Sequence, residues 1–184
     1  MRKAGVEDAV RLLKAGDVIA YPTEAVYGLG CDPANDAALA KLIVLKNRAP
    51  DKGFILIAAS LEQLRPWLGD VDTQTLARCT ATWPGPTTWV LPARPGLTRL
   101  LTGDHDTLAV RVTAHREAAA LCRAYGSALI STSANLSGAQ PARSVAELEA
   151  QFGDSVAVVV TGKLGDSARP TPIRDARTGQ ALRE

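Results

Sequence analysis

The sequence predicts a single α/β domain built on a mixed β-sheet. Short apolar runs of strand length alternate with segments of helical periodicity along the whole chain, which is the pattern of an α/β domain. Several of these runs follow one another without an intervening helix, which indicates antiparallel as well as parallel pairing. The chain has 184 residues and shows no internal repeat or linker, so we expect residues 1–184 to form one domain.

In the N-terminal half, glycine and capping residues mark the ends of the expected elements. Gly16 is a stop for the first helix, Asp36 is placed to cap the next long helix, and SLEQ at 60–63 has the form of a capping box. The stretch YPTEAVYGLG, with its two glycines, is expected to be a loop. The expected elements are a helix over 6–13, a strand over 17–21, a helix over 36–46, a strand over 53–58, a short helix opening at 60 and a helix over 73–80.

Similar signals divide the C-terminal half. WPGP at 83–86 breaks the preceding helix, and SVAE at 144–147 is a second capping box. The closing segment 173–184 has the form of a hairpin around Thr178 and Gly179. The other expected elements are strands over 87–93 and 107–112, a helix over 116–125, a strand over 128–131, a helix from 144 to about 153 and a strand over 155–161.

The composition excludes several classes of protein. Hydrophobic residues make up 46% and charged residues 22%, and the formal net charge is +2, which argues against a disordered chain and against a strongly basic, histone-like binder. Cys31, Cys79 and Cys122 are odd in number and have no CxxC spacing, so neither a disulfide framework nor a zinc site is predicted. The N-terminus has no apolar stretch of signal-peptide type, and no run approaches membrane-spanning length. We expect a soluble, cytoplasmic protein.

Common catalytic motifs do not occur. TGKL at 161–164 lacks the first glycine and the final hydroxyl of a phosphate-binding loop. His105 and His115 have no metal-binding arrangement, so no metal ligand is predicted. STSAN at 131–135 lacks the GxSxG elbow, which disfavours a serine hydrolase.

A cluster of cations follows the long helix. In LKNRAPDKG, the residues Lys46, Arg48 and Lys52 lie close together, and Pro50 and Gly53 indicate that the helix ends here. A loop at this point can direct all three cations at one anion. The alternative is that cations at a helix C-terminus only complement its dipole.

Short polar side chains line the end of a predicted strand. In LISTSANLSG, Ser131, Ser133 and Asn135 fall on one face, because alternate side chains of a strand point the same way. Such a row can bind phosphate, ribose or an amino acid. The alternative is a side-chain turn that caps the strand, ended by Gly138.

An arginine lies inside an apolar strand. Arg111 occurs in TLAVRV, and a buried guanidinium is costly unless it is paired. Its partner is therefore either a structural carboxylate or the carboxylate or phosphate of a ligand, which the guanidinium fork can bind at two points. With the cations and hydroxyls, it indicates a site that binds anions by positioning and electrostatics, as in phosphoryl and nucleotidyl transfer.

Six stretches occur in one order along the chain: YPTEAVYGLG, LKNRAPDKG, WPGPTTWVLPA, LAVRV followed by His115, STSANLSG and RPTPIRD. This set resembles the single-domain bacterial members of the YrdC/Sua5 family, the threonylcarbamoyl-AMP synthases of tRNA modification, and the resemblance covers nearly the whole chain. It implies a twisted mixed β-sheet flanked by helices around a large basic cavity. It also implies that L-threonine, bicarbonate or CO2, and ATP are joined into threonylcarbamoyl-adenylate with release of pyrophosphate. The partner implied downstream is a threonylcarbamoyl-transferase complex that modifies adenosine 37 of tRNA, and weak binding of tRNA or other RNA is a further expectation.

The resemblance also implies roles for particular residues. Lys46 and Arg48 would act in catalysis by neutralising the anions, with Mg²⁺ held through the phosphates of ATP and by no protein ligand. The residues implied to bind ATP are Lys46, Arg48, Thr107, Ser133 and Asn135. The residues implied to bind threonine are Thr23, Arg111, Ser131 and Thr171, with Arg111 taking the carboxylate.

The chain departs from the family pattern in three places. Ala25 replaces a threonine, Thr171 and Pro172 replace the usual serine and threonine, and GAQPARSV differs from the usual segment. Pro172 removes a hydroxyl and a backbone donor, which leaves a catalytically silent paralogue as one alternative. An RNA-binding or ribosome-assembly protein is another, although a net charge of +2 and the lack of interleaved aromatic and basic residues speak against it.

Overall fold

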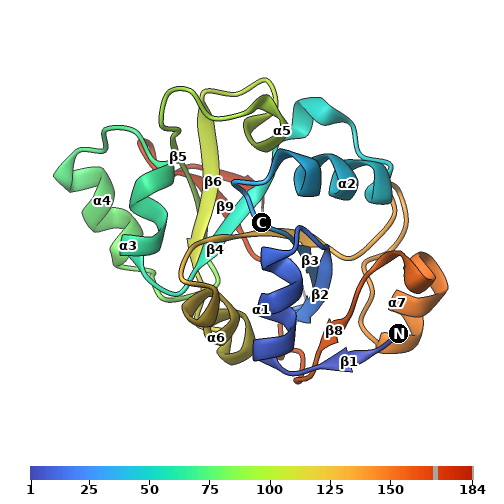
Figure 1. Ribbon diagram of the computed structural model, residues 1–184. Coiled ribbons are helices and arrows are strands. Elements are labelled where there is room, and N and C mark those ends of the chain that lie inside the picture. Colours follow the sequence, from blue (N-terminus) through green and yellow to red (C-terminus); the bar gives the residue numbers. More distant parts are fainter. Residues whose placement is uncertain (168–169, 184) are drawn as a thin grey trace.

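The computed structural model describes residues 1–167 and 170–183, whose strands form one mixed sheet (Figure 1). The strands are β1 (Lys3–Ala4), β2 (Ile19–Pro22), β3 (Tyr27–Gly30), β4 (Ile55–Ala58), β5 (Thr88–Pro92), β6 (Thr107–Val112), β7 (Leu129–Ser133), β8 (Val159–Val160), β9 (Ile173–Asp175) and β10 (Ala181–Arg183). Their order in the sheet is β1-β8-β2-β3-β7-β4-β6-β5-β9-β10. The pairs β1–β8, β8–β2, β4–β6 and β5–β9 are parallel and the other neighbours are antiparallel. This confirms the mixed α/β sheet expected from the sequence.

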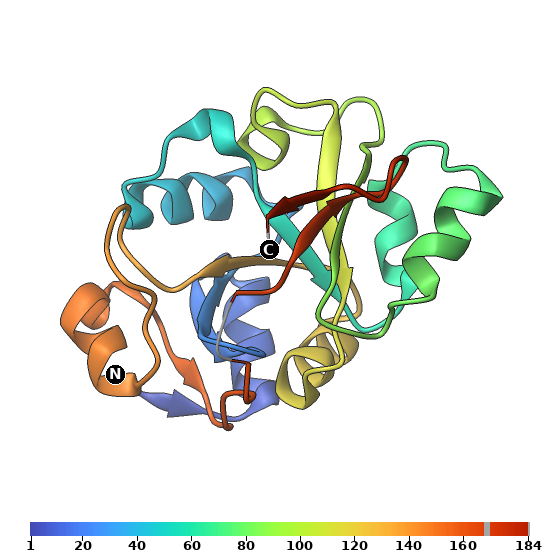
Figure 2. The same ribbon diagram turned by 180° about the vertical axis from the view of Figure 1, so that it is seen from behind.

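Helices cover the sheet and lie between its strands in the sequence. They are α1 (Val6–Lys14), α2 (Asp36–Lys46), α3 (Leu61–Leu64), α4 (Thr73–Thr80), α5 (Arg99–Thr102), α6 (Arg116–Tyr125) and α7 (Val145–Phe152). Single 3₁₀ turns occur at Pro50–Lys52, Arg65–Trp67 and Gly153–Ser155. The C-terminal hairpin of β9 and β10 is seen in front of the sheet in Figure 2, and its last strand ends near the middle of that view.

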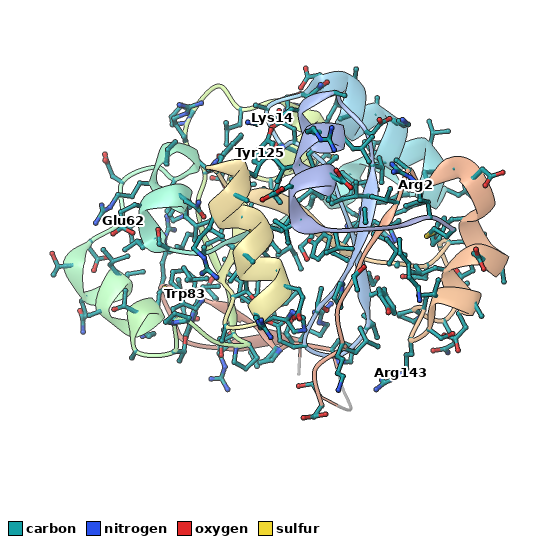
Figure 3. All side chains as sticks on the ribbon, turned by 60° about the horizontal axis from the view of Figure 1, so that its bottom comes forward. Arg2, Lys14, Glu62, Trp83, Tyr125 and Arg143 are labelled. Atoms are coloured by element: carbon teal, nitrogen blue, oxygen red, sulfur yellow. The ribbon has the colours of Figure 1, made fainter. Side chains whose placement is uncertain are left out.

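The two faces of the sheet pack against different apolar clusters. Along β4, Ile57 joins the cluster that includes α1 and α6, while Leu56 and Ala58 join the cluster that includes α2, α5 and α7, as the alternation of side chains along a strand requires. Figure 1 shows α1 and α6 side by side on their face. Charged side chains such as those of Glu62 and Arg143 lie at the periphery (Figure 3).

The stretch YPTEAVYGLG is a hairpin, not a loop. Residues 19–22 and 27–30 pair as antiparallel strands, joined by a turn in which the Thr23 hydroxyl donates to the carbonyl of Val26 at 2.6 Å. Gly30 lies within β3 because the chain is crowded there: a Cβ would stand 2.6 Å from the carbonyl oxygen of Ile130 and 2.8 Å from the ring of Tyr21. Gly30 is therefore needed for the close approach of the neighbouring strand and of the Tyr21 ring. In the sequence, the two glycines had suggested that the chain leaves the strand here and forms a loop.

Two of the expected helix caps differ in detail. The N-cap of α2 is Asn35, whose side chain accepts from the amide of Ala38 at 3.1 Å, and Asp36 is the first helical residue. Ser60 makes no side-chain cap bond to α3. Ser144 does cap α7, accepting from the amide of Glu147 at 3.2 Å.

Some elements are shorter than expected, and β1 and α5, like β3, were not predicted. Of the strand expected over 155–161, only Val159–Val160 is assigned as β8, and Ser155 belongs to the preceding 3₁₀ turn. Ala157 and Val158 still hydrogen-bond to the backbone of Val18 and Ala20. The two-residue strand β1 and the four-residue helix α5 are too short to give a periodic pattern. The three cysteines are buried free thiols. No helix in residues 1–167 and 170–183 is both long and apolar enough to cross a membrane.

Candidate functional site

Two adjoining cavities lie beside the central strands of the sheet. The first has a volume of about 350 Å³ and the second of about 420 Å³, which are sizes typical of small-molecule sites. Arg48, Ile55 and Arg183 line both, so the cavities meet at these residues. A ligand that occupies both cavities would lie next to two arginine side chains where the cavities meet.

The register of the strands brings distant polar residues to the first cavity. Strand β4 pairs with β7 on one side, where Ile55 is opposite Ser131, and with β6 on the other, where Ile57 is opposite Arg111. Residues in register on neighbouring strands point to the same face, as do residues two apart on one strand. Ser131 and Arg111 therefore share the face on which Ile55 lines the cavity.

All four residues expected to bind threonine line the first cavity. Thr23 comes from the β2–β3 turn, Arg111 from β6, Ser131 from β7, and Thr171 from the segment before β9. Thr171 is fixed from two sides, because its hydroxyl accepts from Arg111 at 2.7 Å and its carbonyl accepts from Arg183 at 2.8 Å. The tertiary structure thus gathers residues that are up to 148 positions apart in the sequence.

Arg111 has both an internal partner and a face on the cavity. One terminal nitrogen, Nη2, donates to Glu24 at 3.3 Å, and the other, Nη1, donates to the hydroxyls of Thr88 and Thr171 at 3.3 and 2.7 Å. Glu24 also accepts from the hydroxyl of Thr113 at 2.8 Å. Within the described part of the chain, the buried Nε of Arg111 has no hydrogen-bond partner. The internal ion pair considered from the sequence is present, and the same guanidinium lines the cavity.

Arg48 and Lys52 line the second cavity, and Arg48 lines the first as well. The Arg48 guanidinium donates to the carbonyl of Gly53 at 2.7 Å and lies 5.0 Å from the centre of the Phe54 ring. These contacts hold its side chain between the two cavities. Its Nε is buried without a partner among the described residues, so Arg48 also retains donor capacity.

Lys46 does not converge with these two cations. It is the last residue of α2 and is buried, and its ammonium donates to the carbonyls of Ser133 and Asn135, the latter at 2.7 Å. It is not among the residues that line either cavity. Burial, and then the nearby charge of Arg48, lower the pKa of Lys46 to about 8. The ammonium is thus committed to the end of β7.

The other residues expected to bind ATP divide between the cavities. Ser133 and Asn135 line the first, and Thr107, at the start of β6, lines the second. The Ser133 hydroxyl donates to the side-chain oxygen of Asn135 at 2.6 Å, and the Asn135 amide donates to the carbonyls of Leu136 and Ala139. A side-chain turn ends the strand, as one of the two sequence alternatives expected, and Ser133 and Asn135 also line the first cavity.

The departures from the family pattern are accommodated. The carbonyl of Pro172 accepts from the amide of Thr88 at 3.0 Å, so the proline joins the sheet through the one backbone group that it retains. Ala139 and Pro141, from the atypical segment GAQPARSV, line the first cavity.

Arg183 is a cavity residue that sequence reasoning did not single out. It comes from β10 and lines both cavities. The residue is exposed overall, but partial desolvation of its guanidinium, and then the charge of Arg111, lower the pKa of Arg183. In the sequence, Arg183 is one of several charged residues in the short C-terminal hairpin. Its neighbours in the sequence give no sign that it lines a cavity.

Comparisons with known proteins place the chain in context. The Sua5/YciO/YrdC family model, described as "Telomere recombination", matches residues 11–184. A threonylcarbamoyl-AMP synthase of Aliivibrio fischeri is 50% identical over 97% of this chain and 98% of its own. One of Halorhodospira halophila is 54% identical over 97% of this chain and 93% of its own.

Several solved structures of similar fold are more than 25% identical to this chain, among them a Sua5 and a YciO structure. Sua5 of P. abyssi complexed with L-threonine is 27% identical with a TM-score of 0.88, and the match covers 98% of this chain and 54% of that one. E. coli YciO is 26% identical with a TM-score of 0.84, over 100% of this chain and 93% of that one. This chain therefore corresponds to about half of the archaeal protein and to nearly all of the bacterial one.

Proposed function

This chain belongs to the Sua5/YciO/YrdC family, and we propose that it is a threonylcarbamoyl-AMP synthase. In this reaction L-threonine, bicarbonate or CO2, and ATP form L-threonylcarbamoyl-adenylate and pyrophosphate. One structural observation carries the proposal: two cavities meet at Arg48 and Arg183. The product has an amino-acid end and a nucleotide end joined at a phosphate, so it suits two cavities that meet between cations.

The first cavity supplies the threonine side. Arg111 binds the carboxylate through the donors that its protein partners leave unused. Thr23, Ser131 and Thr171 offer hydroxyls for the polar groups of the amino acid. The ion pair with Glu24 keeps the guanidinium in one orientation before the substrate arrives.

The nucleotide occupies the second cavity and extends into the first. Arg48 and Arg183 neutralise the phosphates at the junction, Thr107 contacts the nucleotide in the second cavity, and Ser133 and Asn135 contact it from the first. Lys46 serves this side through the turn that carries Ser133 and Asn135. Mg²⁺ is held through the phosphate oxygens of ATP, as is usual for this ion.

The chemistry follows from bringing these groups together. The threonine amine adds to CO2 and loses a proton, which gives a carbamate. A carbamate oxygen then attacks the α-phosphorus of ATP, a new P–O bond forms, and pyrophosphate leaves. The work of the protein is to align two anions that repel each other and to offset their charge, which the arginines do without a change in their own protonation.

The product would pass to a threonylcarbamoyl-transferase complex that modifies adenosine 37 of tRNA. A cytoplasmic location and weak affinity for tRNA or other RNA are part of the same proposal. RNA affinity that came only from exposed cations would disappear at moderate salt.

The deciding experiment measures pyrophosphate release by the purified protein. ATP, bicarbonate and L-threonine are each omitted in turn, and mass spectrometry identifies the adenylate. We expect release only with all three substrates, and a large loss in Arg48→Ala but not in Arg123→Ala, which changes an exposed arginine of α6. Absence of the adenylate, despite measurable binding of ATP or RNA, would reject the synthase and favour a binding protein or a silent paralogue.

A further inference from the structure

We propose that Lys46 is a positioning residue: its ammonium holds the turn formed by residues 133–137, and thereby places Ser133 and Asn135 against the first cavity, without contacting the nucleotide. The kinetic consequence rests on the proposed function, whereas the structural clamp does not. The family resemblance implied a different role, in which Lys46 and Arg48 together neutralise the anions.

Lys46 contacts the 133–137 turn at three points. Its ammonium donates to the carbonyls of Ser133 and Asn135, and its own carbonyl accepts from the amide of Ser137 at 2.9 Å. The residue is only 4% exposed, so these contacts are shielded from competing water. The end of α2 and the end of β7 are thus joined by one residue.

The turn depends on this contact for its position. Residues 136–140 are exposed, and the hydrogen bonds between the side chains of Ser133 and Asn135 lie within the turn itself. Those bonds set the shape of the turn but do not attach it to the domain. Attachment comes from Lys46, from Ala134, whose amide donates to the carbonyl of Tyr27 at 2.8 Å, and from Leu136, whose amide donates to the side chain of Gln151 in α7 at 3.0 Å. Of these groups, Lys46 is the one that binds the turn on both sides of Ala134. Exposed loops with few such attachments are mobile.

The position of Lys46 favours the clamp over a direct contact with a phosphate. An ammonium has three donors, and two of those of Lys46 serve the carbonyls. Lys46 lines neither cavity, whereas Arg48, two residues further on, lines both. If the ammonium turned away to follow a phosphate, the carbonyls of Ser133 and Asn135 would lose the donor that joins them to α2. Arg48 is already placed to neutralise the phosphate.

The charge of Lys46 is consistent with an internal role. Burial and the neighbouring Arg48 both disfavour the ammonium and lower the pKa of Lys46 to about 8. The carbonyl oxygens offset part of this cost by accepting its hydrogen bonds. A neutral amine still has two N–H donors, so the clamp does not depend on the proton that is lost.

A first test labels lysines of the unmodified protein with acetic anhydride, followed by mass spectrometry. We expect Lys46 to react at least tenfold more slowly than the half-exposed Lys41 of the same helix, both with and without ATP. Lys52, which is exposed and lines the second cavity, should react readily and be protected by ATP. Rapid labelling of Lys46 that ATP suppresses would overturn the proposal.

A second test compares Lys46→Met and Lys46→Arg with the matched control Lys41→Met. Methionine has a similar length and no donor, while arginine keeps the charge on a longer, planar group that has to fit a buried site occupied by a single ammonium. In both Lys46 variants we expect the backbone amides of residues 134–139 to exchange hydrogen at least tenfold faster, while the exchange rates in β4 stay unchanged. We also expect the KM for ATP to rise at least fivefold. The control should change neither quantity.

The outcomes separate the clamp from the proposed reaction. A raised KM for ATP with unchanged amide exchange, or normal activity in Lys46→Arg, would mean that Lys46 acts directly on the nucleotide. Should Lys46→Met fail to fold, the labelling of the unmodified protein decides. If the unmodified protein makes no adenylate, the proposed function fails, and amide exchange and labelling still test the clamp.

Discussion

Replacing Arg111 with lysine tests how the first cavity recognises its ligand. The substitution keeps one positive charge but replaces a planar fork by a single nitrogen. In the structure, Arg111 donates to Thr88, Thr171 and Glu24 while its Nε remains without a partner among the described residues. One lysine nitrogen cannot serve these partners and a ligand carboxylate together, so at least one charge-assisted bond to the ligand is lost.

The size of the effect follows from that bond. A hydrogen bond to a charged group contributes about 1.5–3 kcal/mol, which corresponds to a KM for threonine raised about 10- to 150-fold. The KM for ATP should change less than twofold, since Thr107 and Arg48 remain. We expect the free energy of unfolding to fall by about 1–3 kcal/mol because Glu24 and the two threonines lose part of their partner.

The assay is pyrophosphate release at saturating ATP and bicarbonate with threonine varied, together with urea unfolding of the same preparations. Arg123→Lys is the matched control, because it makes the same change on the exposed face of α6. An unchanged KM for threonine in folded Arg111→Lys would refute the assignment of the carboxylate to Arg111. An equal rise in the KM for ATP would instead mean that the substitution disturbs the whole site.

Three further predictions concern stability. Glu24→Gln removes the negative charge that pairs with Arg111 but keeps the shape of the glutamate side chain. Urea unfolding should show a free energy of unfolding that is lower by up to about 3 kcal/mol, and unchanged stability would show that the ion pair contributes little. Gly30→Ala places a methyl group 2.6 Å from a carbonyl oxygen of β7 and should lower the free energy of unfolding by about 2 kcal/mol, measured by thermal or urea unfolding. Unchanged stability of this variant would contradict the prediction. Because the pKa of Lys46 is about 8 in the fold and 10.5 in a model lysine, the unfolded chain binds more protons between these values, and stability should rise with pH. The gain over Lys46→Met, measured in urea from pH 7.5 to 10, should reach at most about 3 kcal/mol, and a flat difference would mean that Lys46 keeps its ordinary pKa.

Most of the fold could be predicted because its elements have local signals. Helices α1, α2, α4 and α6 begin and end within a few residues of the positions that periodicity and glycine indicated. The stretch around Gly28 and Gly30 was misjudged, because the reason for these glycines is a close approach of Tyr21 and of β7. That contact joins parts of the chain far apart in the sequence, and no local pattern records it.

The candidate site was predicted less completely than the fold. Residue types and order in the sequence indicated a site for anions, and the structure brings Thr23, Arg111, Ser131 and Thr171 to one cavity. Two features could not be seen locally: Arg183 belongs to the site, and Lys46 faces carbonyls instead of a cavity. Both depend on where a hairpin or a helix end docks against another strand.

The sequence by itself determined the class of fold, the family and the chemical character of the site, because periodicity, caps and motif order are properties of neighbouring residues. The tertiary structure alone decided which charges meet. Lys46 and Arg48 are two residues apart, yet the left-handed backbone of Asn47 ends the helix between them. Lys46 therefore faces the end of β7, and Arg48 lies between the two cavities. The packing of remote strands buries the Lys46 side chain and leaves that of Arg48 facing the cavities. This difference in burial, which the local sequence does not record, gives the two cations different positions relative to the site.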